Sequence, residues 1–221
     1  MTTSNSRDFN LDVAEVIEEA YERCGLEVRS GYDAKTARRS LNLMFAEWAN
    51  RGLNLWTVKQ GTITLTQGQA QETLLDDVVD LLDVVLRRNN TDFTVERISR
   101  GDYSTFPNKT TQGRPSQYWF DRQVAPIINL WSVPENSTDQ LVYYYVRRIQ
   151  DADTLVNTTD MPFRFFPCMV AGLAYYISMK RAPERLSMLK SVYEEEFQRA
   201  ADEDSGRTSL KLQPSSSYLR V

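Results

Sequence analysis

The 221-residue sequence contains no histidine. This absence excludes the Ser-His-Asp and Cys-His arrangements of nucleophilic hydrolases, and it removes the commonest metal-binding side chain. Neighbouring acids such as Asp151 and Asp153 are the residue type that hydrolyses glycosides, but adjacent carboxylates on polar segments are usually solvated surface groups. We therefore expect a protein that is not an enzyme, with no cofactor and no catalytic or metal-binding residues.

Cysteine is scarce, and long apolar runs are missing. Cys24 and Cys168 each lie among apolar residues at helical spacing, which indicates two buried thiols in a reducing compartment rather than a disulfide or a metal pair. No stretch approaches the roughly 20 apolar residues of a membrane helix, and residues 1–10 are polar. We expect no membrane span and no secretion signal, and hence synthesis in the cytoplasm.

Basic side chains are not in excess. The chain has 26 Lys and Arg against 30 Asp and Glu, which gives a formal net charge of −4 and a pI near 5.1. A protein that binds nucleic acid tightly needs a basic face to displace phosphate counterions. The composition therefore argues against salt-driven wrapping of DNA, while the length and the 41% hydrophobic content allow one good core or two small ones.

Helical periodicity occurs at both ends of the chain. Apolar residues recur every three or four positions from 13 to 24, before Gly25, and from 34 to 50, with Asp33 as the expected N-cap and Gly52 as the stop. The same period returns after residue 160, in one helix that follows Pro162 and another that begins at Pro183. Each pair should form an antiparallel hairpin, and the two hairpins bury their apolar faces best as a four-helix bundle.

The middle of the chain changes to a period of two, which is typical of strands. Within residues 57–68, Ile63 and Leu65 alternate with Thr62, Thr64 and Thr66. Further strands are expected at 81–88, 93–99, 117–123, 127–133 and 140–149. The last of these is bulky on both faces, which predicts a central strand. Residues 99–116 lack a period and are predicted to form a long protruding loop.

These elements predict an α+β fold in which the N- and C-terminal helix pairs form a four-helix bundle and an antiparallel β-rich module is inserted between them. The expected units are an N-terminal hairpin at 1–55, the β-rich module at 56–159, a C-terminal hairpin at 160–205 and an extended arm at 206–221. The joint between bundle and module should fall at Trp48, Gly52 and Trp56. Trp48 would complete the bundle core, Gly52 would turn the chain outward, and Trp56 would begin the module.

The segment RTSLKLQPSSSYLRV, residues 207–221, contains three basic residues and no acidic one. One interpretation is a disordered tail, as is common at chain termini. The other is an extended arm that docks on a partner. The candidate arm residues are Arg207, Leu210, Leu212, Tyr218, Leu219 and Arg220.

Four segments, taken in order, resemble one protein family over nearly the whole chain. They are LNLMFAEWANRGLNLW, with its Trp-x-x-Arg-Gly-x-x-x-Trp spacing, ERISRGDY followed by PNKTTQGRPSQYW, YYYVRRIQDA, and PFRFFPCMVAGLAYYISMKRAPERLSMLKSVYEEE. Together they are similar to the head-to-tail adaptors of short-tailed, podovirus-like bacteriophages, the tail tubular protein A type.

The resemblance implies a structural virion protein assembled in the bacterial host cytoplasm. Twelve copies would form a ring below the portal protein, with a tail nozzle of the tail tubular protein B type beneath it and DNA passing non-specifically through the centre. It also implies that the C-terminal arm docks on the portal. The loop with Tyr103, Phe106 and Arg114 is our candidate contact with a neighbouring subunit or the nozzle, and a solvated loop is the alternative.

Two other functions stay open from the residues alone. A receptor- or carbohydrate-binding tail protein would use Tyr118, Trp119 and Trp131 as exposed aromatic side chains. A sequence-specific DNA regulator would use the N-terminal helices, although the first of these helices is acidic.

Overall fold

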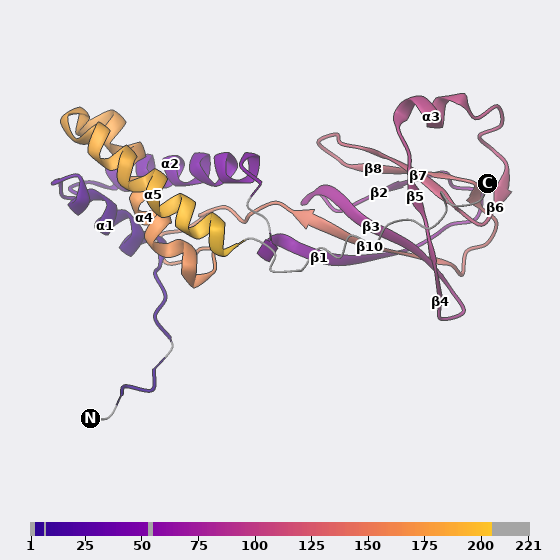
Figure 1. The fold of residues 1–221 in the computed structure, drawn as a ribbon, viewed down its shortest axis with the longest axis horizontal. Helices are drawn as coiled ribbons and strands as arrows, with labels where there is room; N and C mark the ends of the chain where they lie inside the picture. Colours follow the sequence, from indigo (N-terminus) through magenta and orange to yellow (C-terminus); the bar gives the residue numbers. More distant parts are fainter. Residues whose placement is uncertain (1–2, 7, 53–54, 205–221) are drawn as a thin grey trace, which may run out of the picture.

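The protein has a mixed α+β fold with a helical part and a β part that lie end to end along its long axis (Figure 1). The structure is a computed structural model that describes residues 3–6, 8–52 and 55–204. All six candidate arm residues lie outside this range. The helices are α1 Val13–Arg23, α2 Gly31–Asn50, α3 Arg100–Thr105, α4 Phe166–Arg181 and α5 Leu186–Glu203, with 3-10 turns η1 Leu55–Thr57, η2 Phe163–Phe165 and η3 Pro183–Arg185. The strands are β1 Val58–Thr64, β2 Gln71–Thr73, β3 Val78–Arg88, β4 Thr91–Thr94, β5 Glu96–Arg97, β6 Gln112–Gly113, β7 Gln117–Asp121, β8 Ile127–Trp131, β9 Val133–Pro134 and β10 Gln140–Arg147.

Helices α1, α2, α4 and α5 share one hydrophobic cluster, although they come from opposite ends of the sequence. Helix α4 is central, because it packs against each of the other three and is buried on nearly every side. The sequence pattern predicts one buried face for this helix, but in the structure α4 is buried on most of its faces. The regular geometry of a four-helix bundle stays a prediction.

A buried hydrogen-bond chain joins α2 to α5 within this cluster. The indole N–H of Trp48 donates to the hydroxyl of Tyr193 at 2.8 Å, and that hydroxyl donates to the Glu47 carboxylate at 2.9 Å. Burial is the largest influence on Tyr193, and its pKa is raised well above the ordinary value. The Arg51 guanidinium bonds to Glu47 and Glu194 at the rim and lies 4.2 Å from the centre of the Phe197 ring. The Trp48–Tyr193 bond is buried, while Glu47, Arg51 and Glu194 carry the paired polar groups out to the partly exposed rim.

Helix α2 begins earlier than its apolar pattern indicates. Ser30, not Asp33, is the N-cap, because the Ser30 side chain accepts the backbone N–H of Asp33. Asp33 instead lies in the first turn, where a negative charge is favourable near the positive end of the helix dipole. Both residues are good caps by type, so composition alone does not choose between them.

The β part contains two four-stranded sheets, ordered β1-β10-β3-β4 and β2-β8-β7-β5, and a short β6-β9 pair. Their pairings are antiparallel except for β5-β7 and β6-β9. A second hydrophobic cluster draws its side chains from both four-stranded sheets. Strand β10 is an inner strand, as its bulky side chains predict, and Tyr144 is its one exposed position. Gly61 of β1 lies opposite Tyr143, whose ring occupies the space of any added Cβ.

The predicted loop at 99–116 is partly wrong, since it contains helix α3. Ser99 and Asp102 form a capping box, in which each side chain accepts the other's backbone N–H. A helix of six residues is too short to show a helical period, and only its Tyr103 is buried. The capping pair was the available sequence signal.

Gly172 of α4 should be intolerant of alanine. A Cβ built there lies 2.5 Å from the Met44 sulfur and 2.8 Å from the Tyr193 ring. Overpacking of this kind costs about 1–3 kcal/mol, and the better helix propensity of alanine offsets about 1 kcal/mol. We expect Gly172→Ala to lower the free energy of unfolding by up to about 2 kcal/mol in urea denaturation. Gly31→Ala is the matched control, because no heavy atom lies within 4 Å of its added Cβ. Equal stability of the two variants would contradict the close packing of α4.

Candidate interaction sites

The two parts of the molecule meet where the chain crosses between them. The Trp56 indole packs against Phe165, with ring centroids 4.7 Å apart, and its N–H donates to the backbone carbonyl of Asp160 at 3.0 Å. Phe165 is fully buried and also contacts Trp48, at a centroid distance of 5.8 Å. One phenylalanine therefore lies against both tryptophans of the candidate joint. Gly52, with φ of +82°, follows α2 in the left-handed region that favours glycine.

The side chain of Asp160 adds an ion pair at the same place. Arg147, at the end of β10, donates to the Asp160 carboxylate through both terminal nitrogens, one at 2.8 Å. The backbone N–H of Gln150 donates to it as well, at 3.1 Å. The side chains of Arg147 and Asp160 are only 7% and 19% exposed, so solvent screens this pair weakly. Burial raises the pKa of Asp160, but these hydrogen bonds together outweigh it and the net pKa is lowered.

Sequence reasoning passed over Arg147 and Asp160. Arg147 ends a strand whose preceding residues are nearly all buried, and a buried arginine requires a carboxylate partner. That requirement was a usable signal. It does not say which of the following acids, Asp151, Asp153 or Asp160, is the partner.

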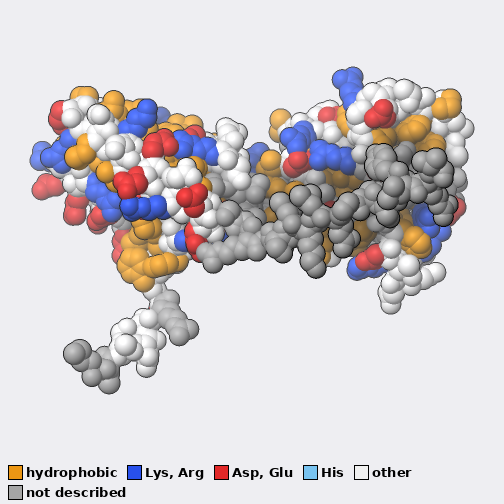
Figure 2. Space-filling model, viewed as in Figure 1, with side chains coloured by type: hydrophobic (Ala, Val, Ile, Leu, Met, Phe, Trp, Pro, Cys, Tyr) orange, Lys and Arg blue, Asp and Glu red, His pale blue; other side chains and the backbone are white. Residues whose placement is uncertain are grey.

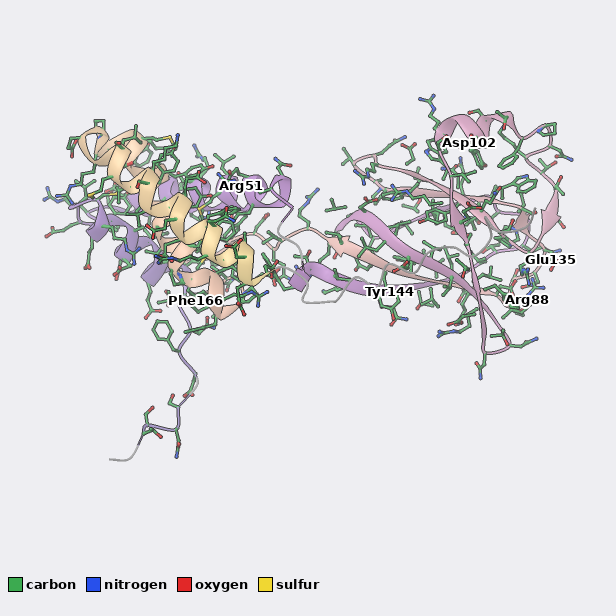
Figure 3. The ribbon with its side chains drawn as sticks, in the orientation of Figure 1. Arg51, Arg88, Asp102, Glu135, Tyr144 and Phe166 are labelled. Atoms are coloured by element: carbon green, nitrogen blue, oxygen red, sulfur yellow. The ribbon has the colours of Figure 1, made fainter. Side chains whose placement is uncertain are left out.

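The candidate contact loop is held against the second sheet at the far end of the β part, where Asp102 marks α3 (Figure 3). Tyr103 is buried, and its ring contacts those of Phe106 and Trp119. Phe106 stacks on Trp131 with centroids 4.2 Å apart and the rings 10° from parallel. The Trp131 N–H donates to the carbonyl of Asn108 at 3.2 Å. The loop is thus fastened to β7 and β8.

Arg114 does not join this aromatic group. Its guanidinium lies 4.2 Å from the centre of the Phe93 ring on β4, and the residue is exposed. Of the three candidate contact residues, Tyr103 is largely covered, Phe106 is half-buried and Arg114 is open to solvent. Arg114 and the edge of Phe106 are therefore the groups that a partner could reach.

The aromatic residues considered for sugar binding do not form an exposed platform. Tyr118 is 1% exposed, which corrects its assignment as an exposed side chain. Trp119 lies against Tyr103, and Trp131 has Phe106 stacked on it. Burial of alternate side chains along β7 explains Tyr118, because successive side chains point to opposite faces.

The structure offers little reactive chemistry in the residues it describes. No group of three or more Cys, Asp or Glu within that part of the chain could hold a metal ion. Both cysteines are free and buried, and burial raises the pKa of the Cys168 thiol. Among the acids that the structure describes, Asp139 and Asp204 are buried, and they are paired with Arg88 and Arg164 respectively. Among the described helices, none has the length and apolarity needed to cross a bilayer.

The Asp160 joint should make stability depend on pH. Because its folded-state pKa is below the ordinary 3.8, the ion pair stabilises the fold above about pH 4, and this contribution disappears as the pH falls through the lowered value. At pH 7 we expect Asp160→Asn to lower the free energy of unfolding by about 2–4 kcal/mol. The difference from the unmodified protein should narrow below about pH 4.

The control for this comparison is Asp92→Asn, which breaks another bidentate arginine pair, with Arg87, on an exposed hairpin. Exposed pairs contribute little, so that variant should unfold almost as the parent does. Urea titrations at several pH values measure both. A constant gap between Asp160→Asn and the parent down to pH 2.5 would show that the carboxylate charge is not what holds the joint.

Comparison with known proteins identifies the family of this chain. No curated protein matches the sequence. The family model described as SU10 adaptor protein matches residues 11–217, a span that includes both hydrophobic clusters and the joint between them. Because this match covers nearly the entire chain, the protein belongs to the SU10 adaptor family and is a structural head-tail adaptor of a bacteriophage.

Proposed function

We propose that the protein is one subunit of a closed ring between the portal protein and the tail nozzle of a phage particle, as in adaptors of the tail tubular protein A type. Twelve copies, assembled in the host cytoplasm, would form this ring. The observation that carries the proposal is the joining of two separate hydrophobic cores at one joint, so that one chain presents a helical surface at one end and a β surface at the other (Figure 1).

The proposed units keep the boundaries expected from the sequence, namely 1–55, 56–159, 160–205 and the arm at 206–221, with the two hairpins as a four-helix bundle. In a closed ring every interface joins two different surfaces of the same subunit, so assembly is cooperative. A subunit stiffened at its joint suits this role, because bending between the two parts would change the angle at which the ring closes.

DNA would pass through the ring without specific contacts. The net charge of −4 is consistent with this, since a negative surface repels phosphate where a basic one would grip it. The C-terminal arm would reach the portal, and Phe106 and Arg114 would contact a neighbour or a nozzle subunit. No observation favours the alternative of a carbohydrate-binding tail protein, because Tyr118 is buried and Trp119 and Trp131 are half-buried, each with another ring packed on it.

Assembly with portal protein tests the proposal. Size-exclusion chromatography with multi-angle scattering should show the subunit alone as a monomer and, with portal protein, a complex that has gained about twelve copies. Electron cryo-microscopy of that complex should show a ring with a central channel. A subunit that ignores the portal, or that binds duplex DNA tightly at moderate salt, would overturn the proposal.

Arg114 should matter for assembly more than for folding. Removing its contact with Phe93 should change the free energy of unfolding by no more than about 1 kcal/mol. If the loop meets a partner, Arg114→Ala should weaken attachment of the nozzle or closure of the ring roughly tenfold, because arginine is enriched among dominant interface residues. Arg29→Ala is the control, since Arg29 is another exposed arginine, paired with Glu27 on the helical part. Assembly of Arg114→Ala at the parent's concentrations would remove this residue from the proposed contact.

A further inference from the structure

A groove on the helical part has no role in the features described above. It has a volume of about 450 Å³ and lies between the N-terminal segment, α1 and the start of α4. Its floor is apolar and its rim is acidic. The apolar lining consists of Phe9, Leu11, Phe163, Phe166, Pro167 and Val170, and the charged lining consists of Glu15, Glu18, Glu19, Glu22 and Arg23.

The aromatic floor is open to solvent to an unusual degree. Phe9 and Phe163 are 65% and 69% exposed, although they touch each other and Phe166 edge to face. Figure 2 shows apolar side chains gathered at this lower edge of the helical part, where Figure 3 labels Phe166. A contiguous exposed apolar patch with a polar rim is typical of a binding surface.

The acidic rim includes carboxylates that are not paired with a basic side chain among the described residues. Glu19 is paired with Arg23, and Glu15 belongs to the capping box of α1. Glu18 and Glu22 are exposed and make no ion pair with any residue that the structure describes. A segment that combines apolar side chains with positive charge would complement both the floor and the rim.

We propose that this groove holds residues 206–221 of the same chain before the subunit assembles. From residue 207 onward this segment has Arg207, Lys211 and Arg220 and no acid, together with leucines at 210, 212 and 219 and Tyr218. It therefore has the charge opposite to the rim and the side chains that an apolar floor binds.

The segment begins close to the groove, because the last described residue before it lies beside the groove floor. Asp204, the last described residue, is paired with Arg164, which is the sequence neighbour of Phe163 in the floor. Residues 205–221 span roughly 50 Å when extended, at about 3.3 Å per residue. They can therefore reach every part of a groove that begins beside their own anchor. Because the two are tethered, the effective concentration of the segment at the groove is high, on the order of millimolar.

This docking gives the arm two alternative sites. In the free subunit the arm lies on its own groove, and in the particle it leaves the groove for the portal. The second step rests on the proposed function, whereas the first concerns the isolated chain. The arm leaves the groove only when its contacts with the portal replace its contacts with the groove. The arm therefore stays covered until a portal is present.

Cysteine cross-linking in the full-length chain tests the docking. Glu19→Cys places a thiol on the rim and leaves every phenylalanine, Glu18 and Glu22 in place, and Ser209→Cys places one in the arm. The native cysteines do not compete, because both are buried and burial raises the pKa of both thiols. Under mild oxidation at low protein concentration, we expect a monomeric disulfide to form at least roughly tenfold faster than in the control pair Val124→Cys with Ser209→Cys. Val124 is 96% exposed on the β part.

Charge reversal on the rim of the groove is the second test of the docking. Adding Glu18→Lys and Glu22→Lys should slow the monomeric cross-link several-fold while circular dichroism stays unchanged, since both side chains are exposed. A rate equal to the control pair, or a cross-link that forms only between two chains, would overturn docking on the same subunit. A monomeric cross-link that portal protein fails to diminish would overturn the release step and leave the docking standing.

Discussion

Asp160 is the point on which the arrangement of the two parts depends. The chain passes from the helical part to the β part before β1 and returns after β10, and both passages meet at this residue. Its carbonyl accepts the Trp56 indole N–H, and its carboxylate accepts Arg147 from the end of β10. An arginine and an aspartate this far removed from water would cost several kcal/mol if unpaired. The pairing therefore strongly disfavours any separation of the two passages.

Phe165 extends this constraint into the helical core. It lies five residues after Asp160 and contacts both Trp56 and Trp48, so the joint and the core share one buried aromatic group. Trp48 continues the connection through Tyr193 to α5, and Tyr193 in turn leaves no room for a side chain on Gly172 of α4. Large side chains in close packing transmit displacement rather than absorb it. The position of the β part is thereby coupled to the packing of α2, α4 and α5.

Sequence patterns predicted the elements whose repeats are long enough to be seen. The helices at both ends and the inner position of β10 follow from periodicity. Periodicity does not reveal helix α3, because six residues are too few to show a period. It also does not identify Ser30 as the N-cap of α2, because Asp33, three residues later, is an equally good cap by type. The Arg147–Asp160 pair and the groove depend on segments that only the fold brings together, so a pattern along the chain does not specify them.

Positive and negative charge are unevenly distributed along the chain. The segment after Asp204 contributes three positive charges to a net charge of −4, so the remainder of the chain carries −7. An arm lying on the acidic rim of α1 would partly neutralise the helical part, which reduces repulsion between free subunits. Once the arm has moved away, that part regains its full negative charge. In the proposed ring this charge would disfavour retention of DNA phosphates. Each interface would then need other contacts strong enough to overcome repulsion between neighbouring subunits. When the arm leaves the rim, repulsion between neighbouring subunits increases. Binding of the arm to a partner at that same step would offset this repulsion.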